Sequence, residues 1–179
     1  MSYFTQYFED LTESIKHVDE TLLLHSAELV QKVKDSNAKI IIAGNGGSAA
    51  MASHVSVDFT KAAKVRAVNF NEADLITCFG NDYGYENWIK EALIAYSDPG
   101  DLLILVSSSG QSANIINAAK ESSRLGLDLI TLSGFEENNP LRELGAVNFW
   151  INSSNYNYVE MTHHIWLLAI CDFVITNNS

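Results

Sequence analysis

The chain has 179 residues, which is long enough for one domain to bury a hydrophobic core without cross-links. Its 22 acidic and 11 basic residues give a net charge of −11, and this excess of acid argues against nucleic acid as a partner. Residues 1–10 contain no basic residue, so no signal peptide is indicated, and the apolar run at residues 165–171 is too short to cross a membrane. Cys78 and Cys171 lie far apart in apolar stretches, which favours buried, reduced thiols in a cytoplasmic protein.

The first predicted element is a helix over residues 3–34, where apolar residues recur at helical spacing and no Gly or Pro interrupts the pattern. Short apolar runs follow at residues 40–43, 65–68, 102–106, 127–132 and 147–151, and several are continuous, as in strands covered on both faces. Helical patterns occupy residues 49–61, 85–96, 112–125 and 159–176. This alternation predicts an α/β fold with a doubly wound, mainly parallel five-stranded sheet flanked by helices. We expect a single domain of residues 1–179 with an N-terminal helical segment at residues 1–36.

Two loops of small residues follow two of the predicted strands. Residues 44–48 (Gly-Asn-Gly-Gly-Ser) follow the first strand, and residues 107–112 (Ser-Ser-Ser-Gly-Gln-Ser) follow the third. Each loop precedes a helix, so backbone N–H groups and hydroxyls at a helix N-terminus can stabilise an anion. Each loop alone could be a plain turn or a helix cap. Because ligands of parallel sheets bind beyond the carboxyl ends of the strands, the pair predicts a site for a phosphorylated small molecule.

Together with residues 80–86 (Gly-Asn-Asp-Tyr-Gly-Tyr-Glu), the two loops resemble the motifs of the sugar isomerase (SIS) domain, and within it those of the phosphoheptose isomerase family. The resemblance extends over nearly the whole chain. It implies conversion of the ketose sedoheptulose 7-phosphate to the aldose D-glycero-D-manno-heptose 7-phosphate, early in bacterial heptose synthesis for surface polysaccharide. It also implies a homotetramer with active sites between subunits and, in many members, a bound zinc ion. Two alternatives stay open: an isomerase of a different sugar phosphate, and a non-catalytic SIS protein that binds a sugar phosphate as a regulator.

The resemblance assigns substrate binding to residues of all three motifs. These are Asn45, Gly46, Gly47 and Ser48 in the first loop, Asn81 and Asp82 in residues 80–86, and Ser107, Ser108, Ser109 and Ser112 in the second loop. The serines would hold the phosphate. Asp82 could also cap a helix that starts near Gly84.

Aldose–ketose isomerisation needs a base, together with an acid or a metal that polarises the carbonyl. The family places a His and a Glu on the helix after the first loop, and a Gln and a His on the last helix. The matching residues here are His54, Asp58, Glu160 and Leu168, so the Glu is shortened and the last His is absent. His164 shares a helix face with Glu160 and lies one turn before Leu168.

These residues lead to the hypothesis that His54, Asp58, Glu160 and His164 form a divalent metal site, with zinc as the first choice and manganese or iron open. Asp58 and His164 are the expected catalytic groups, and Asp58 and Glu160 are also expected to contact the substrate. His163 is as well explained by packing as by function.

Overall fold

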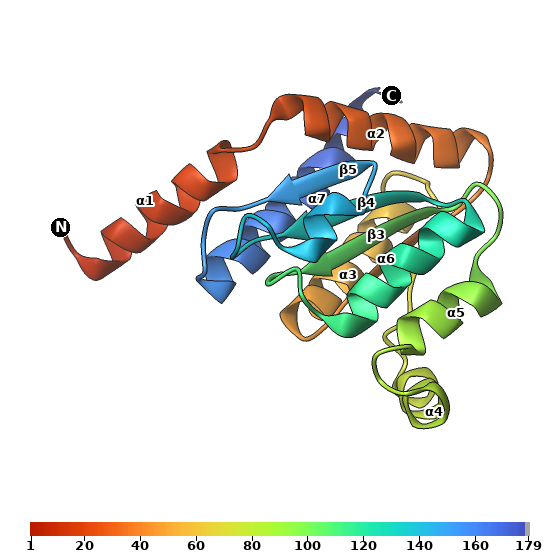
Figure 1. Ribbon diagram of the computed structural model, residues 1–179. Helices are drawn as coiled ribbons and strands as arrows, with labels where there is room; N and C mark the ends of the chain where they lie inside the picture. Colours follow the sequence, from red (N-terminus) through yellow and green to blue (C-terminus); the bar gives the residue numbers. More distant parts are fainter. Residues whose placement is uncertain (178–179) are drawn as a thin grey trace.

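A five-stranded sheet runs through the middle of the protein and carries helices on both faces (Figure 1). The computed structural model describes residues 1–177, so the last two residues of the predicted domain lie outside the described part. The strands are β1 (Ile40–Gly44), β2 (Ala67–Asn69), β3 (Leu102–Ser107), β4 (Asp128–Ser133) and β5 (Val147–Trp150). The helices are α1 (Tyr3–Lys16), α2 (Glu20–Asp35), α3 (Gly47–Lys61), α4 (Ala73–Tyr83), α5 (Trp88–Tyr96), α6 (Ala113–Leu125), the 3-10 helix η1 (Pro140–Glu143) and α7 (Tyr156–Asn177).

All five strands are parallel and lie in the order β2-β1-β3-β4-β5, which confirms the predicted doubly wound α/β fold. β1 and β3 are buried along their whole length. Successive side chains of a strand point to opposite faces. Ile40 and Ile42 therefore pack in one core with α2, α3 and α7, whereas Ile41 and Ala43 pack in a second core with α5 and α6.

A buried ion pair holds together the amino ends of β1 and β3. Lys39 Nζ lies 2.5 Å from an Asp101 carboxylate that is fully buried, and 2.6 Å from Asp98. Asp101 also accepts the backbone N–H groups of Lys39 and Asp98. Burial acts to lower the pKa of Lys39, but the two carboxylates outweigh it and raise the pKa. The residues just before both strands are thus fixed relative to one another.

The single helix predicted over residues 3–34 is wrong, because the chain forms two helices there. α1 ends at Lys16, and Asp19 begins α2 by accepting the backbone N–H of Thr21 at 2.9 Å. An N-cap aspartate restarts a helix in this way, and it interrupts the apolar pattern too briefly to be noticed in it. α1 projects from the body of the protein and buries none of its residues (Figure 1).

Helix α4 was not predicted. Its signals are the acidic residues at its start and the helical spacing of Leu75, Ile76 and Phe79, which pack against the second core. The helix predicted over residues 85–96 begins at Trp88 instead, with Asn87 at its N-cap position. Asp82 therefore lies in the last turn of α4 and does not cap the next helix.

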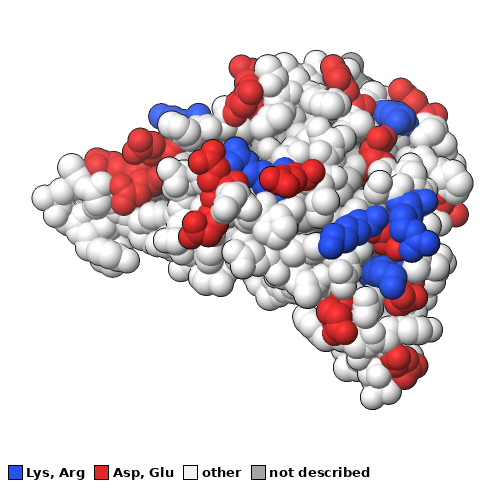
Figure 2. Space-filling model, viewed as in Figure 1, with Lys and Arg blue, Asp and Glu red and all other residues white. Residues whose placement is uncertain are grey.

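The cysteines and the surface charges can be compared with the predictions. Cys171 is buried, but Cys78 on α4 is exposed, so its predicted burial is wrong because α4 lies at the periphery. On the face in Figure 2, Lys and Arg side chains are interspersed with Asp and Glu rather than gathered into a broad basic surface.

Within residues 1–177, α7 is the one helix whose 22 residues and mean hydropathy of 1.3 would permit a membrane span. The predicted apolar run at residues 165–171 is only part of this helix. α7 packs against α2 and α3, and eight of its residues are buried inside the protein. A core helix meets the same criteria of length and hydropathy, so they give only weak evidence for a membrane segment.

Candidate active site

The two small-residue loops lie side by side at the point where the strand order reverses. β1 and β3 are neighbours, and their last paired residues are Gly44 and Val106. α3 leaves β1 toward one face of the sheet and α6 leaves β3 toward the other. A crevice opens between two such helices at the carboxyl ends of their strands, which is where ligands of open α/β sheets bind.

A pocket of about 280 Å³ occupies this crevice. Its lining consists of Asn45, Gly46, Gly47 and Ser48 from the first loop, Val106, Ser107, Ser108, Ser109 and Ser112 from β3 and the second loop, and Tyr156 and Glu160 from α7. Nine of the predicted substrate-binding residues are therefore brought to one pocket. No Lys or Arg among residues 1–177 lines it, so its donors are hydroxyls, backbone N–H groups and the Asn45 amide.

The hydroxyls of the serine loop are not used to cap α6. Ser112 occupies the N-cap position of α6, but its hydroxyl makes no capping hydrogen bond and lies 3.1 Å from the hydroxyl of Ser107. Gly110 closes the loop with a positive φ of 64°, and a side chain there would collide with the amide of Asn139. The tight turn keeps several hydroxyls on the pocket side.

The glycine loop is joined to α6 by a pair of amides. Asn45 donates to Asn114 Oδ1 at 3.0 Å, and Asn114 donates back to Asn45 Oδ1 at 2.8 Å. The Tyr85 hydroxyl also donates to Asn45 Oδ1, at 3.0 Å. Gly46 follows with φ 56° and ψ −121°, a conformation that glycine adopts readily, and α3 then starts at Gly47.

Glu160 forms the opposite wall of the pocket. Its carboxylate occupies the space that a side chain on residue 47 would need, so a Cβ on Gly47 would collide with it. Within residues 1–177 the carboxylate makes no hydrogen bond and no ion pair. Burial raises the pKa of Glu160 above its usual value.

The two histidines of the hypothesis meet between α3 and α7. His54 Nδ1 and His164 Nε2 are 2.9 Å apart, and Asp58 Oδ2 lies 3.4 Å from the other ring nitrogen of His54. Burial, and then the proximity of His54, lower the pKa of His164, while Asp58 opposes this shift. Leu168 packs against the core, one turn further along.

His163 is a packing residue. It is fully buried, and its Nε2–H donates to the carbonyl of Ser133 at the end of β4, at 3.0 Å. Burial lowers the pKa of His163 to about 4, so the ring is neutral near pH 7. This hydrogen bond fixes the rotation of α7 that turns Glu160 toward the pocket.

A model of the SIS domain matches residues 3–134 of the chain. A phosphoheptose isomerase of Aliarcobacter butzleri is 32% identical over 177 residues, which cover 96% of this chain and 93% of that protein. One from Campylobacter concisus is 32% identical and covers 85% of each chain. The solved structure of the phosphoheptose isomerase GmhA from Neisseria gonorrhoeae superimposes with a TM-score of 0.85 at 28% identity, covering 96% of this chain and 95% of that one. The chain belongs to the phosphoheptose isomerase family of SIS-domain proteins. It is an enzyme of the aldose–ketose isomerase type.

Three of the predicted substrate-binding residues do not line the pocket: Asn81, Asp82 and Asp58. Asn81 and Asp82 are exposed at the end of α4, where the Asn81 amide donates to Asp82 Oδ1 at 2.9 Å. Tyr85 is the member of this motif that reaches the glycine loop. Asn114 and Tyr156 were not predicted as site residues, because neither has a signal in the chain beyond its place next to a loop or in a helix.

The family resemblance implies a zinc ion, for which the histidine pair is the candidate site. Within residues 1–177, no group of three or more His, Cys, Asp and Glu side chains is arranged to hold a metal ion, so the predicted set of four is not assembled. Glu160 faces the pocket instead. The two facing nitrogens of His54 and His164 do fit two ligand positions, and Asp58 stands behind His54 as a carboxylate stands behind a metal-binding imidazole.

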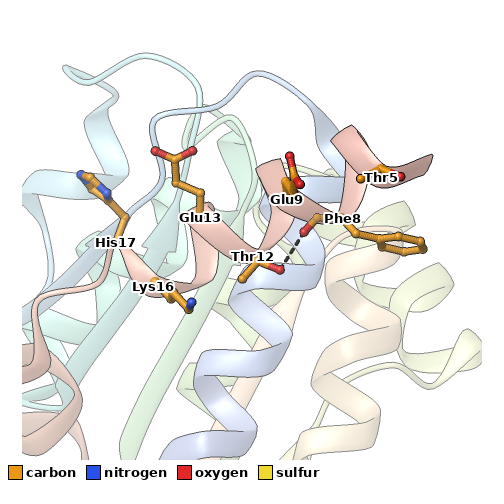
Figure 3. A pocket seen from close by; sticks show the side chains of 7 residues that line it. All are labelled: Thr5, Phe8, Glu9, Thr12, Glu13, Lys16 and His17. Carbon is orange, nitrogen blue, oxygen red and sulfur yellow. Dashed lines mark hydrogen bonds between the residues drawn. The ribbon is translucent and has the colours of Figure 1, made fainter. Parts of the chain in front are cut away.

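A second, more open hollow lies on α1 (Figure 3). Its lining residues are Thr5, Phe8, Glu9, Thr12, Glu13, Lys16 and His17, all from this helix and its C-cap. The Thr12 hydroxyl donates to the carbonyl of Phe8, as the dashed line shows. The hollow shares no residue with the two loops of this family member and cannot enclose a ligand from one helix alone.

The substitution Asn114→Ala tests the amide pair. It removes both hydrogen bonds of the amide pair and leaves Asn45 only the one from Tyr85, so we expect the free energy of unfolding to fall by about 2 kcal/mol. Urea unfolding followed by circular dichroism measures the change. Asn117→Ala on the same helix removes a more exposed hydrogen bond to the Glu86 carbonyl and should cost less than about 1 kcal/mol. Equal losses in the two variants would contradict a special role for the pair.

Proposed function

We propose that the chain isomerises sedoheptulose 7-phosphate to D-glycero-D-manno-heptose 7-phosphate by proton transfer through an enediolate. The observation that carries the proposal is the single pocket lined by both small-residue loops and by Glu160. Curated relatives that align over almost the whole chain are named phosphoheptose isomerases. We also propose that the reaction takes place in the cytoplasm.

The pocket divides the substrate between its two loops. The hydroxyls of Ser107, Ser109 and Ser112 suit the phosphate, because each can donate a hydrogen bond to an anionic oxygen. This binding needs no positively charged side chain nearby. The glycine loop lets the sugar approach the backbone closely at Gly46, where the space of a side chain is open, whereas the Glu160 carboxylate fills that space at Gly47. Carboxylates for proton transfer are available on α3, at Asp58, and on α7, at Glu160.

The proposed reaction is tested by NMR on a panel of ketose phosphates. We expect turnover of sedoheptulose 7-phosphate with a kcat/KM at least about tenfold above that for fructose 6-phosphate, because binding energy from the longer chain supports the reacting carbons. A control reaction uses the variant Gly47→Asp, whose side chain would collide with Glu160 inside the pocket.

Each alternative predicts a different result. A higher kcat/KM for another ketose phosphate would replace the proposed substrate. Tight binding of sugar phosphates without turnover of any of them would instead favour a non-catalytic regulator.

We propose further that His54 and His164 supply two ligands to a divalent ion, with zinc as the expected metal. Such an ion would polarise the substrate carbonyl as a Lewis acid. Asp58 would orient the His54 ring by accepting its second N–H. The other ligands would come from groups outside this pair.

Elemental analysis tests the zinc proposal. We expect the purified protein to hold about one zinc ion per chain and the variant His164→Ala to lose nearly all of it, since a pair of imidazoles is then reduced to one. His25→Ala, which removes an exposed histidine of α2, should keep the metal. Retention of zinc by the His164 variant would remove this residue from the site.

We also propose a homotetramer with its sites close to the subunit interfaces. Exposed apolar side chains support it on two surfaces: Tyr3, Phe4 and Phe8 on the projecting α1, and Val57, Met161 and Ile165 on the faces of α3 and α7 beside the histidine pair. Exposed apolar groups that gather in this way mark interfaces.

The mass of the protein in solution tests the assembly. Light scattering should give about four times the chain mass of 19.8 kDa. Val57→Glu should lower the mass, because it buries a charge in the proposed interface. Ile94→Glu introduces the same change at an exposed position of α5, on the other side of the sheet, and should leave the mass unchanged. A monomer at micromolar concentration in the unmodified protein would contradict the proposal.

A further inference from the structure

We propose that Glu160, and not Asp58, is the base that removes the proton from C1 of the bound ketose phosphate. The inference rests on the isomerase function proposed above and assigns its proton-transfer group. Asp58 is the residue that the family pattern places in this role. Glu160 stands where the family has a Gln, which cannot accept a proton from carbon.

The first support is the position of the two carboxylates. Glu160 lines the pocket together with the glycine loop and the serine loop. Its oxygens fill the space left by the missing side chain of Gly47, so they lie against the backbone that the sugar must approach. A general base has to come within hydrogen-bond reach of its proton, and only Glu160 among the two carboxylates borders the pocket.

Asp58 is engaged elsewhere. It lies more than two turns along α3 from the glycine loop, and it is absent from the pocket lining. Its carboxylate faces a ring nitrogen of His54 at 3.4 Å, and its side chain is one methylene shorter than the Glu of the family. It is suited to orient His54 rather than to reach a substrate carbon.

The second support is that Glu160 has no competing partner. Its carboxylate makes no hydrogen bond or ion pair with any residue from 1 to 177, and neither Lys nor Arg lines the pocket. A structural carboxylate at a helix surface is normally paired or fully solvated. An unpaired carboxylate on the wall of a phosphate pocket gains basicity when the substrate displaces water, because its charged form loses hydration.

The proton transfers balance without any further reactant. Glu160 takes a proton from C1, the C1–H electron pair forms the C1=C2 bond, and the C2 carbonyl oxygen receives the displaced electron pair, which gives an enediolate. The proton of the C1 hydroxyl then moves to the C2 oxygen, C1 becomes the aldehyde carbon, and Glu160 returns its proton to C2. C1 is oxidised and C2 is reduced within one molecule, so no external redox partner is needed.

The experiment compares Glu160→Gln with Asp58→Asn in D2O. NMR follows turnover and the incorporation of deuterium at C1 of sedoheptulose 7-phosphate and at C2 of the aldose product. Glu160→Gln restores the family residue and keeps the shape of the side chain. We expect it to lower kcat at least about 100-fold and to abolish exchange, with KM changed less than about threefold. We expect Asp58→Asn to keep measurable exchange. Asp172→Asn, an exposed carboxylate later on α7, should behave like the unmodified protein.

A carboxylate-retaining variant separates chemistry from misfolding. Glu160→Asp should recover exchange above the level of Glu160→Gln, and calorimetry with sedoheptulose 7-phosphate should show binding in both variants. Turnover by Glu160→Gln within threefold of the unmodified protein would overturn the assignment while leaving the isomerase function intact. Absence of turnover in the unmodified protein would overturn both.

Discussion

The site depends on the pairing of β1 with β3. These two strands are neighbours although β2 lies between them in the chain, and their register ends at Gly44 and Val106. The glycine loop and the serine loop therefore begin at the same level of the sheet. The Asn45–Asn114 amide pair then ties the first loop to the helix that follows the second. The buried Lys39–Asp101 ion pair fixes the other ends of the same strands. A shift of one residue between β1 and β3 would separate the two halves of the pocket.

The rotation of α7 is the second constraint. His163 is locked to the Ser133 carbonyl at the end of β4, inside the core. Glu160 precedes it by three residues and His164 follows it directly, so all three orientations are set together by the helical repeat. With His163 turned to the sheet, Glu160 meets Gly47 and His164 meets His54. One buried, neutral histidine thus positions two polar groups that play different parts.

Local patterns were sufficient to predict the sheet and the position of the serine loop at its edge. Continuous runs of Ile, Leu and Val mark β1 and β3, and an excess of serines marks residues 107–112, because each signal lies within one segment. The break before α2 and the presence of α4 were missed, since a single N-cap aspartate and a short helix barely change the hydrophobic period. The Asn45–Asn114 pair joins residues 69 positions apart and has no counterpart in either segment alone. Glu160 lies against Gly47 and His164 lies against His54 because α3 packs on α7, and this packing cannot be read from either helix alone.

The departures of this chain from the family pattern act in the same direction. Leu168 is partly buried and packs against the core. The imidazole of His164 instead lies four residues earlier, about 6 Å along the helix axis and nearer the carboxyl edge of the sheet. The carboxylate at residue 58 is shorter, so it stays with His54, while a new carboxylate at residue 160 stands on the pocket wall. On α7 the ionisable side chains of Glu160 and His164 thus lie in the first turns of the helix, before Leu168. The carboxylates of the two helices are thereby divided, with Glu160 beside the two loops and Asp58 beside His54.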